Sequence, residues 1–483
     1  MSLSDLWRVL AVALPALGAL IANLPSVDLT YHLRAGDEIL AAGAIPTTDT
    51  WTWTVAGSPW FDQQWLAQVI LAATYKLAGW TGLAVLRAAL VAVTFGLLGA
   101  AISRRNPGLG PRTVALLVIA AFAVAAVALA LRPQLFGMAL FALTLFLLES
   151  RRERPRAVWL IPVVAVLWAN LHGSFVLLPA ICGIAWIEDL HDRAPRRFEL
   201  LRVGLISMAA SALNPAGFGV WAYAMSLSSN PALSARVTEW QPPTLREPQG
   251  IVFCASVGVV IAVLARVRRR ANWPALIWLF AFVIVGLMAV RGLAWWPLVA
   301  ALVVGGLFEP DAPPAPRTFR PNRLNAVLVG AIALVMVMLL PVWRPLDPGL
   351  NAPAGVVGSA PAGITKVLAD PMQTCQIERI WAPQAWGSWF EFAAPCNPIA
   401  TDSRIELFPD WIWRTYDMIE SGSAEGIDWL SNCGATVTVA AREQAALIRA
   451  LESDVRWVLT YRDEDGAIFA LKPGVEFEEG TVC

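Results

Sequence analysis

The sequence has few charged residues, few histidines and no motif typical of a nucleotide or zinc site. Of its 483 residues, 15% are charged, whereas soluble globular domains carry about 25%. Neither its three histidines nor its six cysteines follow metal-ligand spacing, and no Gly-rich phosphate loop or internal repeat is present. The formal net charge is zero, so the charge balance gives no reason to expect a nucleic-acid partner, and we expect none. These absences argue against a soluble, nucleotide-dependent protein.

Long apolar stretches dominate instead. The chain is 57% hydrophobic, and several stretches of roughly 20 apolar residues are long enough to cross a ~30 Å hydrocarbon core. We therefore predict an all-α polytopic membrane bundle. Its eleven predicted spans lie at about 7–24, 81–102, 113–131, 133–149, 157–173, 174–188, 203–220, 249–266, 273–290, 293–308 and 324–342. The first is not expected to be a signal peptide, because further spans follow it and a small-residue cleavage site is missing.

Arginine-rich loops predict the orientation of the bundle. They all fall on one side if the N-terminus is cytoplasmic, as the positive-inside rule requires. The arginines concerned are Arg104, Arg105, Arg112, Arg151, Arg152, Arg154, Arg156, Arg193, Arg196, Arg197, Arg202, Arg266, Arg268, Arg269, Arg270, Arg317, Arg320 and Arg323. This orientation places the loop 25–80 and the tail from about 345 outside. The Pro- and Arg-rich segment 309–323 becomes a cytoplasmic linker.

The predicted domains are a transmembrane domain at 1–343, a linker at 344–363 and an outer α/β domain at 364–483. In the tail, β-branched and aromatic runs such as "ATVTVAA" and "RWVLTY" alternate with helical patterns at about 408–421, 424–432 and 441–453. Cys182 and Cys254 fall in spans. Four further cysteines lie in the tail and allow three disulfide pairings: Cys375, Cys396, Cys433 and Cys483. The short loop favours Cys375 with Cys396.

The outer loop 25–80 is expected to contain two helices lying at the outer membrane surface. Asp28 is a candidate N-cap for the first, which would end at Gly43. His32 lies four residues after Asp28, so the two are neighbours on that helix. The second helix is predicted at about 62–78, and the Trp-rich stretch "PTTDTWTWTVAGSPWF" would join them.

Polar residues of the predicted spans and short loops cluster at the outer third of the membrane. Such residues are informative because an intramembrane Arg, Lys or Asp costs about 2.5–3.5 kcal/mol. The set comprises Arg87, Arg132, Gln134, Asn170, His172, Asn214, Glu239 and Arg291. Their common level with the Asp28 loop predicts one polar cavity open to the outside. Each member also has a simpler interpretation: arginines reaching headgroups, Asp28 as a cap only, Asn170 with His172 as an interhelical hydrogen-bonding pair, and the tryptophans as an interfacial belt.

An outward-facing cavity has no nucleotide sugar available, so an activated sugar donor must arrive through the membrane. A polyprenyl phosphate meets this need, since its lipid tail lies in the bilayer and its sugar phosphate lies at headgroup level. Arginines suit a phosphate leaving group, and a carboxylate can accept the proton of an attacking hydroxyl. A lipid-linked glycan transporter would also need a polar cavity, and a membrane scaffold with a partner-binding outer domain is a further alternative.

Several stretches resemble a known family. "DLTYHLRAGDEILAAGAIPTTDTWTWTVAGSPWFDQQWLAQV", "RPQ", "WANLHGSF", "NPAG", "EWQPP" and "TDSRIELFP" are similar to landmarks of bacterial membrane proteins assigned to the GT-C superfamily of polyprenyl-phosphate-dependent glycosyltransferases. The resemblance implies a GT-C-like bundle in the bacterial inner membrane. It also implies inverting transfer of a hexose or pentose from the lipid donor to a glycan, lipid or protein acceptor.

The resemblance assigns roles to individual residues. Asp28 matches the early acidic residue that GT-C enzymes use in catalysis, although many members have two adjacent acids there and this chain has Asp28-Leu29. His32 would assist, and Asp49 is a second acidic candidate. The common depth of the polar residues, and not the resemblance, gives the other roles. The expected donor-phosphate ligands are Arg34, Arg87, Arg132 and Arg291, and the expected sugar or acceptor contacts are His172 and Glu239. No cofactor is required, but some members use a divalent metal, for which Asp28, His32 and Asp49 could supply ligands.

Overall fold

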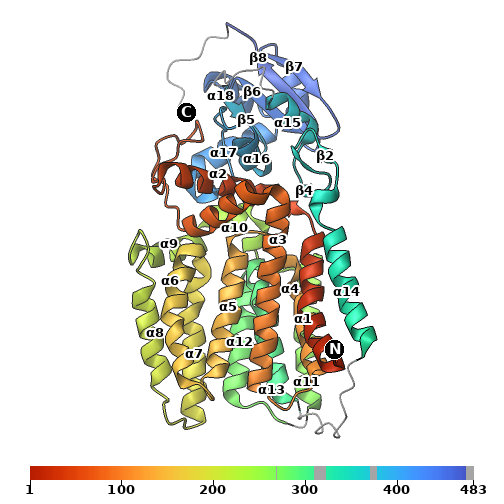
Figure 1. The fold of residues 1–483 in the computed structure, drawn as a ribbon. Coiled ribbons are helices and arrows are strands. Elements are labelled where there is room, and N and C mark those ends of the chain that lie inside the picture. Colours follow the sequence, from red (N-terminus) through yellow and green to blue (C-terminus); the bar gives the residue numbers. More distant parts are fainter. Residues whose placement is uncertain (268, 309–321, 370–377, 475–483) are drawn as a thin grey trace. The chain divides into compact units, whose positions relative to one another are not determined.

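The computed structural model describes residues 1–267, 269–308, 322–369 and 378–474 (Figure 1). Arg268, Arg317, Arg320 and most of the predicted cytoplasmic linker lie outside these ranges. The chain forms two compact units, each built from segments far apart in sequence. We call Met1–Ala22 with Thr81–Trp343 the helical unit, and Asn23–Trp80 with Arg344–Cys483 the mixed unit.

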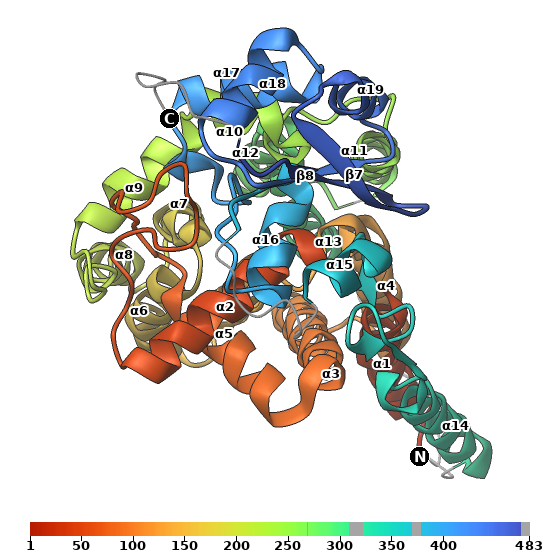
Figure 2. The same cartoon turned by 90° about the horizontal axis from the view of Figure 1, so that it is seen from above.

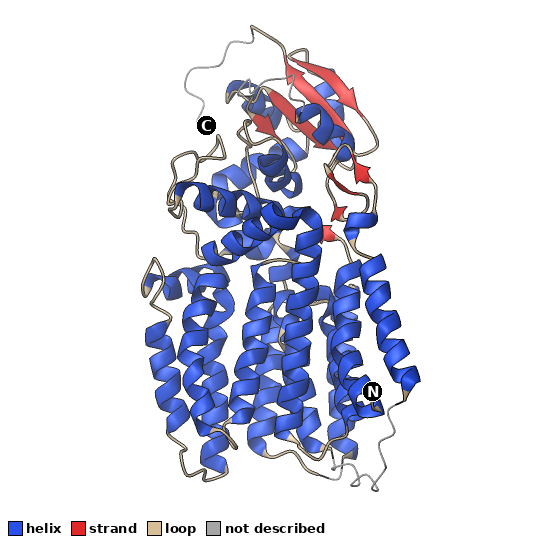
Figure 3. Cartoon of the chain, in the orientation of Figure 1, coloured by secondary structure: helices blue, strands red, loops and turns tan. Residues whose placement is uncertain are grey.

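The helical unit contains long apolar helices that run side by side, together with shorter helices (Figures 1 and 3). They are α1 (Leu3–Ile21), α3 (Trp65–Arg105) from Thr81 onward, α4 (Pro111–Ala125), α5 (Pro133–Ser150), α6 (Ile161–Leu171), α7 (Leu177–His191), α8 (Glu199–Ala210), α9 (Gly219–Ser228), α10 (Pro231–Arg236), α11 (Pro248–Arg266), α12 (Trp273–Met288), α13 (Trp296–Leu307) and α14 (Arg323–Met338). α5 and α13 are the most buried of them. Many begin with proline in their first turn, where the missing N–H costs nothing.

Among the described residues, seven helices are long and apolar enough to cross a membrane. Their bounds are Leu3–Ile21, Trp65–Arg105, Pro111–Ala128, Pro133–Ser150, Gly173–His191, Pro248–Arg266 and Val290–Leu307. Three shorter apolar helices follow at Pro155–Leu171, Trp273–Met288 and Arg323–Met338, and α8 has 12 residues. The chain is thus a mostly helical, multi-pass membrane protein, and the count of eleven spans stays a prediction.

A buried ion-pair network joins one end of α3, α5 and α7. Arg105 donates to Glu149 and to Glu188, each at 2.7 Å, and Arg151 lies 2.9 Å from Asp189. Each charge has an opposite partner, which is the condition under which buried charges are tolerated. The network therefore fixes the register of the three helices at this end of the helical unit.

The mixed unit combines the first loop with the tail. α2 (Ser26–Ala42), the loop that follows it and the first part of α3 belong to this unit. α3 turns sharply at Ala78 and Gly79, where Gly79 adopts a φ of 56°. A two-residue parallel pairing joins β1 (Leu24–Pro25) to β4 (Val357–Gly358), and β2 (Leu346–Asp347) pairs antiparallel with β3 (Ala352–Pro353).

A four-stranded sheet forms the centre of the small C-terminal α/β region (Figure 3). Its order is β5-β6-β8-β7, with β5 parallel to β6 and the other neighbours antiparallel. The strands are β5 (Ile380–Trp381), β6 (Val437–Ala441), β7 (Trp457–Arg462) and β8 (Gly466–Leu471), and the helices are α15 (Ala362–Leu368), α16 (Gln384–Ala393), α17 (Asp410–Glu420), α18 (Ala424–Asn432) and α19 (Ala445–Ser453). α17, α18 and α19 lie together on one side of β7 and β8 (Figure 2).

α2 is the predicted first helix of the outer loop, with one correction. It begins at Ser26 after an N-cap at Pro25, so Asp28 lies in the first turn and is not the N-cap. A carboxylate in the first turn still interacts favourably with the helix dipole. Gly43 ends α2 with a φ of 66°, as the sequence predicted. Gly36 allows close approach to the start of α3, because a Cβ there would lie 2.1 Å from the Gln68 carbonyl oxygen.

Two tail cysteines are oxidised in this structure. Cys396 and Cys433 are both disulfide-bonded, and Cys182 and Cys254 are free. The favoured pairing of Cys396 with Cys375 stays a prediction, because Cys375 and Cys483 lie outside the described residues.

Candidate functional site

The predicted site residues divide between the two units. Asp28, His32, Arg34 and Asp49 belong to the mixed unit, and Arg87, Arg132, His172, Glu239 and Arg291 belong to the helical unit. The geometry within each unit is informative by itself. The predicted single polar cavity stays a prediction.

The tail positions the first turn of α2, which carries Asp28. The Ser403 hydroxyl donates to the Val27 carbonyl oxygen at 2.8 Å, and Thr30 donates to the Ser388 carbonyl oxygen at 2.9 Å. These two bonds flank Asp28 and come from α16 and from the segment that follows it. Asp28 is therefore held by contacts that no local sequence pattern predicts.

A short polar chain joins His32 of α2 to the start of α3. The Gln68 amide nitrogen donates to Asp62 at 2.8 Å and lies 3.3 Å from His32 Nδ1. His32 is 2% exposed. The His32 ring and the Asp62 carboxyl thus both contact the side-chain amide of Gln68, which fixes the orientation of each side chain.

Asp62 is a residue that the sequence reading missed. Burial raises the pKa of its carboxyl to about 7, against the opposing hydrogen bond from Gln68. Its Oδ2 is screened from solvent and accepts no hydrogen bond from the described residues. A carboxyl that titrates near neutral pH is suited to proton transfer. Its only sequence signal is its position at the start of the second predicted helix, directly after the Trp-rich loop.

Negative charge gathers around Tyr31 of α2. Burial, followed by the fields of Asp28, Glu406, Asp62 and Asp402, raises the pKa of the Tyr31 hydroxyl well above its usual value. The charges of Asp28 and Asp62 therefore both act on the Tyr31 hydroxyl. Among the described residues, no group of three or more His, Cys, Asp or Glu side chains is placed to hold a metal ion, so the predicted metal ligands Asp28, His32 and Asp49 do not form such a group.

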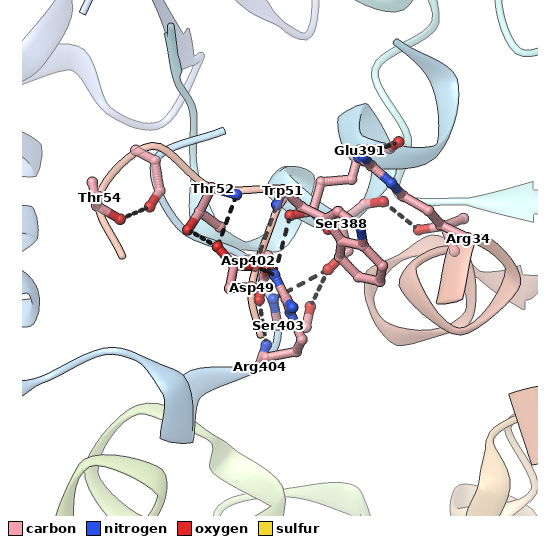
Figure 4. Close-up of polar contacts among 12 residues, drawn as sticks. Arg34, Asp49, Trp51, Thr52, Thr54, Ser388, Glu391, Asp402, Ser403 and Arg404 are labelled. Atoms are coloured by element: carbon pink, nitrogen blue, oxygen red, sulfur yellow. Dashed lines mark hydrogen bonds and ion pairs between the residues drawn. The ribbon is translucent and has the colours of Figure 1, made fainter. Parts of the chain in front are cut away.

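Asp49 belongs to a buried ion-pair cluster with Arg404 (Figure 4). Its carboxylate accepts hydrogen bonds from Arg404 at 2.6 Å and from the Thr52 hydroxyl at 2.6 Å. Arg404 also donates to Asp402 at 2.8 and 2.5 Å. Both Asp49 and Arg404 are almost fully buried. These contacts hold the loop of residues 46–61 to the "TDSR" segment of the tail.

Glu391 is the third carboxyl group of this cluster. Burial and then Asp402 raise its pKa well above the usual range, although Arg404 and Arg34 oppose the shift. Its Oε1 lies 3.8 Å from Arg404. The Arg404 guanidinium also lies over the rings of Trp51 and Trp60, at 4.3 and 4.5 Å from their centroids.

Arg34, a predicted phosphate ligand, is engaged within the mixed unit. It donates to Glu38 at 3.2 Å and to the Glu391 carbonyl oxygen at 3.0 Å. Its guanidinium lies 4.8 Å from the centroid of Trp51. The side chain is 15% exposed. These contacts favour a structural role, and phosphate binding by Arg34 stays a prediction.

Arg132, Glu239 and Arg291 converge in the helical unit. Arg132 Nη1 donates to both carboxylate oxygens of Glu239, at 2.6 and 2.7 Å, and Arg291 Nε donates to Oε2 at 3.2 Å. Arg291 also lies 5.0 Å from the centroid of Trp240. Two arginines thus share one carboxylate, and all three side chains are partly exposed. Guanidinium groups in this arrangement are suited to a phosphate.

Arg87 and His172 are placed differently. Arg87 is 2% exposed and donates to the Ala22 carbonyl oxygen at the end of α1. His172 caps a short 3-10 helix, Gly173–Val176, by accepting from the Ser174 N–H at 3.1 Å.

The fold has relatives among solved structures. No protein-family model and no curated protein sequence matches this chain. The archaeal oligosaccharyltransferase AglB from Archaeoglobus fulgidus, in complex with an inhibitory peptide and a dolichol-phosphate, matches with a TM-score of 0.59 at 10% identity, over 97% of this chain and 74% of that one. The oligosaccharyltransferase of the same organism, tethered to an acceptor peptide with the NVT sequon, matches with a TM-score of 0.58 at 11% identity, over 96% and 74%.

The apo form of that oligosaccharyltransferase matches less closely. Its TM-score is 0.53 at 9% identity, over 98% of this chain and 75% of that one. Identities this low concern the fold alone. The chain therefore has a fold similar to that of the archaeal oligosaccharyltransferase.

Proposed function

We propose that this protein is an integral-membrane glycosyltransferase that moves a sugar from a polyprenyl-phosphate-linked donor to an acceptor hydroxyl at the outer membrane face, with inversion at the anomeric carbon. The observation that carries the proposal is the fold similarity over almost the whole chain to the archaeal oligosaccharyltransferase. That enzyme has been seen with a dolichol-phosphate and with an acceptor peptide. A phosphate-bearing lipid donor is therefore the substrate class we assign.

The arginine pair of the helical unit supports a role in donor binding. Arg132 and Arg291 already hold a carboxylate with three hydrogen bonds of 2.6 to 3.2 Å. A lipid phosphate offers the same kind of oxygens with more negative charge, so the same two side chains would hold it. As the bond between the anomeric carbon and the phosphate oxygen breaks, negative charge grows on the phosphate, and the arginines stabilise it.

The carboxyl groups beside α2 support a role in proton acceptance. We assign Asp28 as the residue that takes the proton from the attacking acceptor hydroxyl or positions that hydroxyl, with His32 assisting. Asp62 is a second candidate for this role, because its pKa of about 7 lets it take a proton near neutral pH. We assign Asp49 to positioning the loop of residues 46–61, because its two carboxylate oxygens already accept hydrogen bonds from Arg404 and Thr52.

The first test identifies the donor. Deletion of the protein should make its lipid-linked sugar accumulate, and mass spectrometry of the lipid extract identifies the sugar. The purified full-length protein in liposomes, supplied with that lipid, should then release polyprenyl phosphate and glycosylate an acceptor fraction. A protein that moves the intact lipid across the bilayer without releasing polyprenyl phosphate is a transporter, and the proposal is then wrong.

The second test addresses Asp28. Asp28→Asn should reduce transfer by at least 100-fold, within the range of about 10²–10⁴ for a lost general base. Asp37→Asn is the matched control: Asp37 lies on the same helix, is exposed and pairs with Lys76. The control should keep transfer within about twofold. Full activity in Asp28→Asn together with loss of activity in Asp62→Asn moves the assignment to Asp62.

A further inference from the structure

A basic cavity lies at one end of α7 and α8 in the helical unit, and no residue of the proposed reaction lines it. It has a volume of about 600 Å³ and is open to solvent. Its lining includes the loop that joins the two helices and the short 3-10 helix Pro155–Leu160. The charged and aromatic lining residues are Trp159, Arg193, Arg196, Arg197, Glu199 and Arg202. Four arginines thus face a single glutamate.

That glutamate does not neutralise the cavity. Glu199 accepts a hydrogen bond from Trp159 Nε1 at 2.9 Å and lies 3.9 Å from Arg196. Within the described part of the chain, no ion pair is found for the other three arginines, Arg193, Arg197 and Arg202. Positive charge therefore exceeds negative charge inside one concave surface.

A neighbouring cavity shows that this excess is local. It has a volume of about 430 Å³ and shares Arg196 and Glu199 with the first. There, Arg151 pairs with Asp189 at 2.9 Å and Arg152 pairs with Asp192 at 3.2 Å. Its other lining arginines are thus matched by carboxylates. Of the two cavities, only the basic one is lined by arginines for which the described residues show no ion pair, namely Arg193, Arg197 and Arg202.

The basic cavity continues into an exposed apolar surface. Phe198 at its rim is 50% exposed, and on the adjoining first turns of α8 Leu201 and Leu205 are exposed as well. The two leucines lie four residues apart and so share one helix face. Trp159, at the other rim, is the residue type that gathers at the membrane interface. A positively charged cavity therefore borders a surface suited to acyl chains.

We propose that this basic cavity binds the phosphate headgroup of an anionic phospholipid, with its acyl chains along the exposed face of α8. Arginine guanidinium groups hold phosphate oxygens bidentately, and basic pockets at the ends of membrane helices recognise anionic headgroups. The 600 Å³ cavity is large enough for a glycerol phosphate group. The site is independent of the proposed glycosyl transfer, because it uses none of the residues assigned to that reaction.

The test measures lipid binding to the purified full-length protein by native mass spectrometry. Phosphatidylglycerol is titrated against a phosphatidylcholine background. The variant is Arg196→Gln/Arg197→Gln, and the control is Arg266→Gln/Arg270→Gln, which removes the same charge from the exposed end of α11 and the loop after it. We expect binding of phosphatidylglycerol to weaken at least tenfold in the variant and less than twofold in the control.

Three results would overturn the proposal. Equal weakening in the two double variants would show diffuse electrostatic attraction without a site. If the native protein bound phosphatidylcholine as tightly as phosphatidylglycerol, the cavity would not distinguish lipids by the charge of their headgroups. Binding of soluble glycerol 3-phosphate as tight as that of phosphatidylglycerol would assign the cavity to a soluble anion. Thermal midpoints in phosphatidylcholine alone confirm that both variants are folded.

Discussion

Glu239 is the residue whose substitution tests the arginine pair most directly. Its carboxylate accepts three hydrogen bonds, two from Arg132 and one from Arg291. If the same arginines hold the donor phosphate, the carboxylate and the phosphate compete for them. Glu239→Gln keeps the shape of the side chain and removes its charge. We therefore expect Glu239→Gln to bind polyprenyl phosphate more tightly than the native protein.

The size of the effect follows from the geometry. Two unit charges about 4 Å apart at the surface of a protein attract each other by about 4 kcal/mol before solvation is counted. The side chains of Arg132, Glu239 and Arg291 are 18%, 34% and 31% exposed, so solvent screening leaves roughly 1–2 kcal/mol for the competing contact. Since 1.4 kcal/mol corresponds to a factor of ten, the gain in affinity should be about 5- to 30-fold.

The assay is a titration of purified protein with polyprenyl phosphate at two salt concentrations. Arg132→Gln should bind it at least tenfold more weakly than the native protein does. Glu247→Gln, the same change in the loop that precedes α11, is the control and should bind as the native protein does. Unchanged affinity in both Glu239→Gln and Arg132→Gln would falsify the assignment of this pair to the donor phosphate, whatever the activity of the protein proved to be.

Three further predictions concern the mixed unit. Because burial raises the pKa of Asp62 from 3.8 to about 7, the folded protein should lose stability as the pH rises from about 4 through 7, by up to about 1.4 kcal/mol per unit; thermal midpoints of Asp62→Asn should lack this fall, and an equal fall would refute the buried carboxyl. Ser403→Ala should lower kcat severalfold with little change in KM, since its hydroxyl positions the turn that carries Asp28; a stability loss without any kinetic change would assign it to the fold alone. Arg404→Gln should cost about 3–5 kcal/mol because it leaves buried carboxylates unpaired, whereas Arg462→Gln, at an exposed pair, should cost at most about 1 kcal/mol; equal midpoints in chemical denaturation would contradict the difference.

Local sequence pattern was enough for much of the fold. The runs "ATVTVAA" and "RWVLTY" became β6 and β7, and the helical patterns in the tail became α17, α18 and α19. α16 was not predicted, because its ten residues "QAWGSWFEFA" mix glycine with aromatics, which are not strong helix formers. The first turn of α2 was misplaced for a similar reason, since Pro25 gives no capping side chain.

The site was harder to predict than the fold. Their positions in the sequence predicted that Arg132, Glu239 and Arg291 lie at the same depth in the membrane. In the structure, both arginines form ion pairs with Glu239. Depth does not reveal partners, however, and it could not show that Glu239 neutralises both arginines. Asp62 and Arg404 were missed because their burial comes from tertiary contacts, which a single sequence does not encode as a period.

The mixed unit is discontinuous, and this has a consequence for biosynthesis. Its first segment ends at Trp80 and its second begins at Arg344, so roughly 260 residues must be made and inserted between the two. At about 5–20 residues per second, the ribosome needs roughly 13–50 s for this stretch. During that interval Arg404 and β4 have not yet been synthesised. The carboxylate of Asp49 therefore lacks its ion-pair partner, and β1 lacks the strand with which it pairs. The first loop is therefore exposed to proteases and chaperones for longer than any other part of the unit, and truncation after α14 should leave it in that state permanently.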